Sequence, residues 1–316
     1  EKDYLSFSPL PGLEVRLMPQ TPLDERLGTG QRVYGVSREL VELAETTPNA
    51  GIQVRAARGV QSDDPVVVRY HLDAENPVVI DHNVVYAEQG SRVTVIFDYL
   101  SDDCAALHNG TLQVYAESDA EVNIVRLQRM SVTSYHLDSV IAYAAEGAEV
   151  KFVHVDLGGA LTALNYTAEL KGKAEVSING AYFGDGTRQL DLNYYADHEG
   201  VGSISSILVH GALKDQAKKV FRGTIDFKRG ARQSKGSEVE SVLLLNEGVR
   251  SIAVPLLLAG EDDVEGEHAA SAGRVDGEKL HYLMSRGLSR DQATKLLVEA
   301  AFQPIIDELP GKEFRG

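Results

Sequence analysis

Between residues 52 and 258 the chain alternates apolar and polar residues in short β-branched runs, which Gly, Asp and Asn separate. Residues 92–98 (RVTVIFD) and 149–155 (EVKFVHV) are two examples. Alternation with a period of two residues is typical of β-strands that bury one face, and helical periodicity is almost absent here. The pattern predicts that residues 52–260 form an all-β core.

A short motif recurs inside this region: a turn residue, a small residue, usually Glu, then Val followed by a polar and an apolar residue. Copies begin at Gly90, Asp119, Gly147 and Lys173, which are 29, 28 and 26 residues apart, and the letters from Gly236 onward predict another copy. A repeat of this length without helices predicts a stacked solenoid such as a β-helix. A sandwich of hairpins with similar turns is the alternative, and the regular spacing favours the solenoid.

The two ends of the chain have a different texture. Residues 1–35 are rich in Pro and Gly, which predicts an irregular or extended arm. Residues 37–46 (SRELVELAET) predict a short helix that Ser37 caps and Pro48 stops. We therefore expect an N-terminal arm and short helix over residues 1–51.

Helical signals return near the C-terminus. Asp276 is a candidate N-cap for a helix over 277–286, and Gly287 suits its end. Residues 289–292 (SRDQ) form a capping box for a second helix, which we expect Pro304 to interrupt and Pro310 to end. The apolar face of this second helix would consist of Ala293, Leu296, Leu297, Ala300 and Ala301. The hairpin would either dock on the β core or be offered to a partner, and residues 261–316 would comprise an acidic loop and this helical segment.

Composition excludes several classes of protein. There are 31 Lys and Arg against 47 Asp and Glu, a net charge of −16, which argues against a nucleic-acid-binding surface. The single cysteine, Cys104, excludes an internal disulfide framework and a metal site built only from this chain's cysteines. No apolar run approaches the length of a membrane span, and no secretory signal is visible, so we expect a cytoplasmic protein.

Sequence motifs for catalysis are missing. The chain has no phosphate-binding loop of the G-x-x-x-x-G-K-[ST] type, no H-E-x-x-H, no G-x-S-x-G and no complete G-x-G-x-x-G. The expectation is a protein that is not an enzyme. Cys104 has His108 four residues on, but a structural or incidental thiol is the simpler interpretation. His154 alternates with valines on a predicted strand, so we expect it to be packed or on the surface rather than a ligand.

One stretch combines groups that ligate iron. Residues 261–268 (EDDVEGEH) contain five carboxylates and a histidine. Carboxylate and imidazole both bind iron, so His268 and Glu267 are candidate metal ligands. A solvated acidic loop between the last strand and the C-terminal helices is the alternative, and the residues alone favour it.

The second half of the chain resembles the SufB/SufD family of iron–sulfur cluster assembly proteins, and more closely its SufD-like members. The resemblance covers roughly residues 75–305, and its most specific parts are 268–276 (HAASAGRVD) and 282–288 (YLMSRGL). Other segments that carry it are 157–160 (LGGA), 169–172 (ELKG), 180–183 (GAYF), 189–191 (QLD), 197–198 (DH), 220–225 (VFRGTI) and 263–264 (DV).

The resemblance implies a right-handed parallel β-helix and a non-catalytic subunit of the SUF machinery. It implies that the C-terminal helical segment docks the ATPase SufC, for which the candidate contact residues are Tyr282, Leu283, Met284, Arg286, Leu288, Leu296 and Leu297. In the family, two SufB/SufD-type subunits pair through their β-helices, so a SufB-type subunit or a second copy of this chain is the other expected partner. A transient iron–sulfur cluster would form near that interface, where His268 stands at the position of the SufD histidine and Glu267 lies beside it.

Three departures from the family pattern concern sulfur. Gly266 stands where SufD-like members carry a cysteine, residues 237–241 (SEVES) lack the cysteine of SufB-type members, and His268 is followed by Ala269 rather than Glu. Any cluster must therefore take its thiolates from another chain. A secreted-type β-helix carbohydrate lyase or glycosidase is the alternative function; it would need a convergent pair of carboxylates, and the lack of Trp and of a secretion signal weighs against it. A homo-oligomeric scaffold without a SufB-type partner is a third possibility.

Overall fold

The strands form two long sheets that face each other. A computed structural model describes residues 5–7, 12–18 and 33–311. Sheet A contains β1 (Leu5–Phe7), β4 (Val66–Leu72), β6 (Arg92–Ser101), β8 (Glu121–Arg129), β10 (Glu149–Asp156), β12 (Glu175–Gly184), β14 (Ile204–Leu213), β16 (Ser234–Leu244) and β18 (Val264–Arg274). Sheet B contains β2 (Leu13–Leu17), β3 (Ile52–Ala56), β5 (Val78–Ala87), β7 (Leu107–Ala116), β9 (Tyr135–Ala144), β11 (Leu161–Leu170), β13 (Gln189–His198), β15 (Lys218–Phe227) and β17 (Arg250–Ala259).

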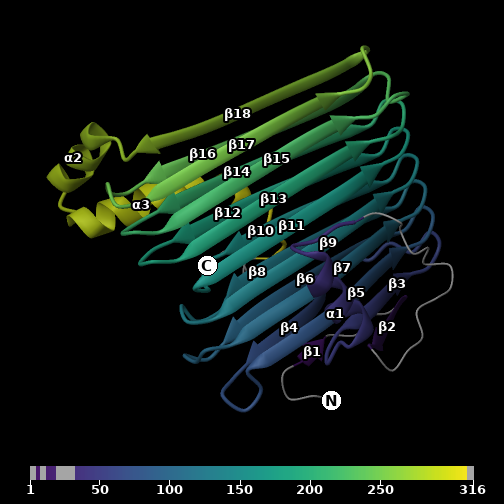
Figure 1. Cartoon of the computed structure of the whole chain (residues 1–316), viewed down its shortest axis with the longest axis horizontal. Coiled ribbons are helices and arrows are strands. Elements are labelled where there is room, and N and C mark those ends of the chain that lie inside the picture. Colours follow the sequence, from purple (N-terminus) through teal and green to yellow (C-terminus); the bar gives the residue numbers. More distant parts are fainter. Residues whose placement is uncertain (1–4, 8–11, 19–32, 312–316) are drawn as a thin grey trace.

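Successive strands alternate between the two sheets, and each strand from β3 on pairs in parallel with the strand one coil away (Figure 1). Only β1 and β2, at the N-terminal end, pair antiparallel among the described strands. The predicted parallel β-helix is therefore confirmed. Two short strands replace part of the irregular arm expected over residues 1–35, and the rest of that arm lies outside the described residues.

The sequence motif marks one turn of each coil. Its first residue adopts a positive φ of 67° at Gly90, 59° at Asp119, 71° at Gly147 and 56° at Lys173. This left-handed conformation suits Gly and is tolerated by Asp, so the chain reverses at the same point of each coil. The turn residue, rather than the strand, sets the period that is visible in the sequence.

The copy that was expected at Gly236 is wrong. Gly236 lies inside β16 and pairs with Ser205 of β14, while the positive φ of that coil occurs at Gln233. Val239 pairs with Leu208, three residues beyond the position that the motif's valine occupies in the other coils. Equivalent residues of successive coils are those that pair in the sheet. By this pairing, the motif-like residues from Gly236 onward are three positions away from the true repeat.

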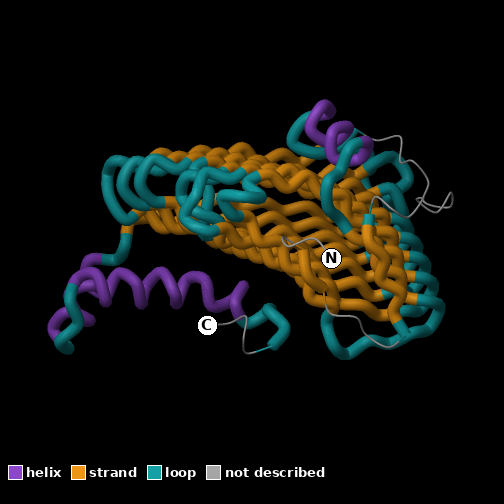
Figure 2. The backbone as a smooth tube through the Cα atoms, turned by 90° about the horizontal axis from the view of Figure 1, so that it is seen from below, coloured by secondary structure: helices purple, strands orange, loops and turns teal. Residues whose placement is uncertain are grey.

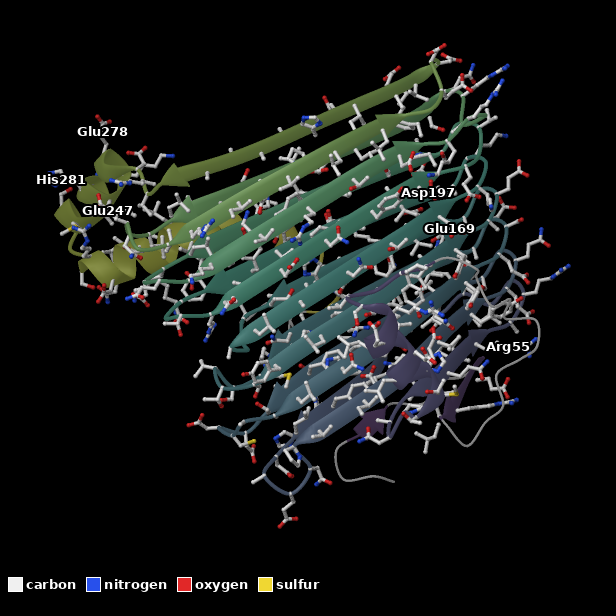
Figure 3. All side chains as sticks on the ribbon, in the orientation of Figure 1. Arg55, Glu169, Asp197, Glu247, Glu278 and His281 are labelled. Carbon is white, nitrogen blue, oxygen red and sulfur yellow. The ribbon has the colours of Figure 1, made fainter. Side chains whose placement is uncertain are left out.

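Parallel pairing stacks like positions of successive coils into columns. Inward columns are largely apolar and form one continuous core between the sheets. Outward side chains of sheet B stack in the same way: the rings of Tyr115 and Tyr143, on neighbouring strands, have centroids 4.9 Å apart. Figure 3 labels three members of this column, which runs through Arg55, Tyr86, Tyr115, Tyr143, Glu169 and Asp197.

Helices cover opposite outer faces of the two sheets (Figure 2). The predicted helix near residue 40 is confirmed as α1 (Arg38–Thr46), and the Ser37 hydroxyl accepts from the Leu40 N–H as the N-cap. It buries Val41 and Ala44 over β5 and β7 of sheet B. Among the described residues, none of the helices has both the length and the apolar character that crossing a bilayer requires.

The C-terminal helical pair is also confirmed, as α2 (Gly277–Ser285) and α3 (Arg290–Ile306). Asp276 caps α2, Gly287 follows it with a φ of 96°, and Ser289 and Gln292 form the capping box of α3. Pro304 does not interrupt α3, contrary to the prediction; it lies inside the last turn. The helix continues because the residues around Pro304 are held by tertiary packing against the solenoid.

That packing involves the second half of α3 and the turn that follows it. Phe302, Ile305 and Leu309 are buried against an apolar patch on the outer face of sheet A, and Lys151 pairs with Glu308 at its edge. The patch consists of Ile96, Val125, Leu127, Val153, Ala181 and Ala212. Of the expected apolar face, Ala293 is buried and Leu297 half-buried, while Leu296 and Ala300 are exposed.

Ile305→Ala should loosen α3 from the solenoid. Deleting a fully buried isoleucine side chain leaves a cavity and costs about 2–5 kcal/mol. We expect faster amide hydrogen exchange in α3 and a lower unfolding temperature. Leu296→Ala is the matched control on the same helix, because that side chain is exposed and its loss should change stability by no more than about 0.5 kcal/mol. Equal exchange in both variants would contradict the docking.

Candidate functional site

The last coil of the solenoid is uncovered. β17 ends sheet B and β18 ends sheet A, so each has a strand neighbour on one side only among the described residues. β17 is apolar on both faces: Val254, Leu256 and Leu258 are 42%, 46% and 44% exposed on the outer face, and Leu257 is 37% exposed on the inner one. An uncovered apolar edge strand is a ready template for pairing with another chain. We call this end, β17 and β18, the open end.

The acidic stretch that was expected as a loop belongs to this end. Residues 261–263 form the turn, and the residues from Val264 onward form β18. The expectation of a loop over 261–268 is wrong, because β18 pairs with β16 along its whole length and this pairing satisfies the backbone groups. The high local charge suggested a loop, but a strand can carry these charges here because β18 is the last strand of its sheet and its side chains are largely exposed.

The two candidate ligands on β18 point to opposite faces. Glu267 is in register with Ser237, which faces outward, whereas His268 is in register with Glu238, which faces inward and is buried. Side chains alternate along a strand, so Glu267 and His268 are not brought together. Glu267 borders an open hollow of about 600 Å³ with Ser206, Ser237 and Glu265. Within the described part of the chain, no three His, Cys, Asp or Glu side chains are grouped closely enough to hold a metal.

One coil below the open end lies an ion pair that the sequence did not reveal. The Lys219 ammonium lies 2.6 Å from Glu240 Oε1, and both groups are fully buried. Lys219 also donates to the Ile252 carbonyl at 3.2 Å, and the Tyr182 hydroxyl donates to Glu240 Oε1 at 3.0 Å. Each charged group thus has a charged partner and a further hydrogen bond, as buried ions require.

Glu238 lies two residues earlier on the same inward face and has no such partners. Its side chain is 0% exposed, and neither carboxylate oxygen has a hydrogen-bond partner among the described residues. The carboxylate packs against Gly223 of β15, where a Cβ would come within 2.2–2.5 Å of its atoms. Burial and the nearby charge of Glu240 raise the pKa of Glu238 to about 7.

The remaining histidine and cysteine expectations concern packing. His154 is buried, with Nδ1 2.7 Å from Asp156 Oδ2 and Nε2 2.9 Å from the Tyr194 hydroxyl, which confirms a packed histidine. His108 is buried inside the solenoid, and both of its ring nitrogens are engaged, by Asp81 and by His136. Cys104 is half-buried against the core in the turn after β6.

Sequence reasoning also missed a buried network around Arg126. Its guanidinium lies 2.5 Å from Asp138 Oδ1 and donates to the Tyr99 hydroxyl at 2.7 Å. The alternation of β8 and β9 places both residues on inward positions, which was the available signal. Their partnership was not visible, because it depends on the register between the two sheets.

The candidate contact residues for an ATPase lie on the helical pair, whose α2 projects beyond the strands at one end of the molecule (Figures 1 and 2). Tyr282, Met284 and Leu296 are 56%, 40% and 44% exposed, and the Arg286 guanidinium lies over the Tyr282 ring at 5.2 Å. Leu283, Leu288 and Leu297 are half-buried. Glu247, Glu278 and His281 project at the same end of the molecule (Figure 3).

The chain is thus a parallel β-solenoid with an apolar open end and a projecting helical pair, and comparison with known proteins identifies its family. Residues 70–301 match the family model described as SUF system FeS cluster assembly, SufBD core domain. The chain belongs to this family.

The chain is similar to named relatives over most of its length. It is 29% identical over 277 residues to the iron–sulfur cluster assembly protein SufD of Bacillus subtilis, which covers 86% of this chain and 63% of that protein. It is 26% identical over 267 residues to an iron–sulfur cluster assembly SufBD family protein of Staphylococcus saprophyticus, covering 83% and 57%. The chain thus spans about three fifths of the length of these relatives.

Glu238→Gln should stabilise the chain at alkaline pH. The folded state raises the pKa of this carboxyl from 4.5 to about 7, so between these values the folded state holds a proton that the unfolded state has lost. Stability therefore falls as pH rises through this window, by on the order of 3 kcal/mol in total. Glutamine keeps the shape of the side chain and removes the cost of burying an ionised carboxylate.

Thermal unfolding midpoints of both forms, measured in chelator between about pH 5 and pH 8, test this expectation. The two midpoints should converge at the acid end and separate at the alkaline end, with the variant the more stable. A difference that does not change with pH would show that the carboxylate is not the cause.

Proposed function

We propose that this chain is a non-catalytic, cytoplasmic subunit of the SUF iron–sulfur cluster assembly machinery, serving as a platform for a SufC-type ATPase and as one side of a cluster-assembly interface. The match to the SufBD core family over residues 70–301 is the observation that carries the proposal, because it spans most of the solenoid and both helices up to residue 301. It favours this role over that of a β-helix lyase or glycosidase.

The ATPase would dock on α2 and the first half of α3. Exposed apolar side chains at Tyr282, Met284 and Leu296 suit a helix-in-groove contact. The second half of α3 is anchored to sheet A through Phe302 and Ile305, so a force on the helical pair reaches the strands. ATP-driven dimerisation of the ATPase would draw two such pairs together and shift the solenoids that they are attached to.

The second partner would pair at the open end. The exposed edges of β17 and β18 suit strand addition, and the apolar outer face of β17 suits burial in an interface. A SufB-type subunit or a second copy of this chain would fill this role, since both would present the same kind of edge.

His268 would contribute an imidazole to the cluster, which is the cargo of the interface and not a resident group. The fit is favourable for His268, because its side chain is exposed and faces the inner side of the open end. The register of β18 does not support Glu267 in the same role. Thiolates must come from the partner, since Cys104, the only cysteine, lies in the turn between β6 and β7.

Met284→Glu should abolish co-purification with the cognate SufC-type ATPase. A carboxylate on the exposed α2 surface cannot be buried in an apolar groove without a large desolvation cost. Val201→Glu is the matched control, because Val201 is also about half exposed (52%) but lies in the turn between β13 and β14. Co-expression and affinity capture provide the measurement. If the ATPase is retained by both variants, or by neither the variants nor the unaltered chain, this docking surface is refuted.

His268→Ala should remove the visible absorption of a cluster in the complex purified anaerobically with the neighbouring Suf proteins. The imidazole is a ligand that this chain would supply to the cluster, so its loss should leave the partner's thiolates short of a ligand. The complex itself should still assemble, because the helical pair is unchanged. An unchanged spectrum would return His268 to a solvated surface role.

A further inference from the structure

The inward side chains near the open end include two carboxyl groups but only one ammonium group. Two carboxylates, Glu238 and Glu240, lie two residues apart on the inner face of β16, and one ammonium, Lys219, lies opposite. All three side chains are fully buried. A buried carboxylate without a counter-charge is costly, so in its ionised form Glu238 needs a cation that the described part of the chain does not supply.

Only one of the two carboxylates is available to such a cation. Glu240 is committed to Lys219 and to the Tyr182 hydroxyl. Both oxygens of Glu238 are without hydrogen-bond partners among the described residues. A Cβ at residue 223 would come within 2.2–2.5 Å of this carboxylate, so the glycine there makes the room that the acid occupies.

A second ligand stands next to Glu238 in the same inward column. His268 is its register partner on β18, and side chains of register partners on neighbouring parallel strands point the same way about 4.8 Å apart. That spacing lets an imidazole nitrogen and a carboxylate oxygen meet at one ion with bonds of about 2.0–2.2 Å. Across the core, the opposite positions are occupied by Gly223 and Pro255, which offer no competing side-chain donor.

We propose that Glu238 and His268 together bind one first-row divalent metal ion, with Fe²⁺ as the cargo, before a partner closes the open end. The mixed imidazole and carboxylate pair selects such ions over Mg²⁺ and Ca²⁺, which prefer oxygen ligands throughout. Water would complete the coordination until the partner's thiolates replace it. This inference rests on the proposed function, and it replaces Glu267 by Glu238 as the carboxylate that acts with His268.

Anaerobic calorimetric titration of Fe²⁺ into the full, metal-free chain tests the proposal. We expect one ion per chain, at least about tenfold weaker binding for both Glu238→Gln and His268→Ala, and no competition from Mg²⁺ at equal concentration. Glu267→Gln is the matched control, because Glu267 neighbours His268 on the same strand but points to the other face. It should bind like the unaltered chain.

Each other outcome overturns the proposal in a way that is separable from the proposed function. If Glu238→Gln binds normally while His268→Ala does not, Glu238 is excluded and the role of His268 in the cluster stands. If the unaltered chain takes up no Fe²⁺, a proton alone neutralises Glu238, and iron binding by this chain is excluded. Co-purification with the ATPase still tests the proposed platform role. Glutamine is isosteric with glutamate, so an unfolding midpoint no lower than that of the unaltered chain rules out misfolding as the cause.

Discussion

Parallel pairing in register between strands one coil apart is the constraint on which the rest of this structure depends. It places every side chain directly over its counterparts in the coils before and after, about 4.8 Å away. Apolar residues can stack in this way without limit, but charges cannot, because like charges in one column repel at close range. Buried charges therefore occur in ion pairs that join the two sheets, such as Lys219 with Glu240 and Arg126 with Asp138.

The same constraint makes the two ends of the stack unequal. At the N-terminal end the antiparallel strands β1 and β2 each add to one sheet, which interrupts the parallel ladder. At the C-terminal end the ladder stops at β17 and β18 with its parallel geometry intact and with leucines exposed on both faces of β17. An end of this kind is suited to continue into another chain, which supports placing the proposed partner and the proposed ion there.

The sequence predicted the features that depend on short spacings. The expected helix is present as α1 with Ser37 as its cap, and the caps at Asp276 and Ser289 are in place, because each cap involves residues within one helical turn. The period of the solenoid was visible because a left-handed turn residue recurs at Gly90, Asp119 and Gly147. These are local requirements of the backbone, and few residue types meet them.

Features that depend on the register between distant strands were not predicted. Glu238 and His268 are thirty positions apart, and only the pairing of β16 with β18 makes them neighbours. Counting charges in the sequence grouped Glu267 with His268 and suggested a loop, whereas alternation along a strand separates these two side chains. Pro304 was misjudged for a similar reason, since the contacts that keep α3 helical around it come from sheet A.

Continuity of the chain links the helical pair to the open end more directly than packing does. β18 ends at Arg274 and α2 begins at Gly277, so two residues separate the strand that carries His268 from the helix that carries Tyr282. β18 is held by β16 on one side only, whereas α3 is fixed to the outer face of sheet A. A movement of α2 would therefore be passed through residues 275 and 276 to a strand that is paired on one side only. Because His268 lies on that strand and Glu238 on its neighbour β16, the two proposed ligands lie where such a movement would reach the solenoid.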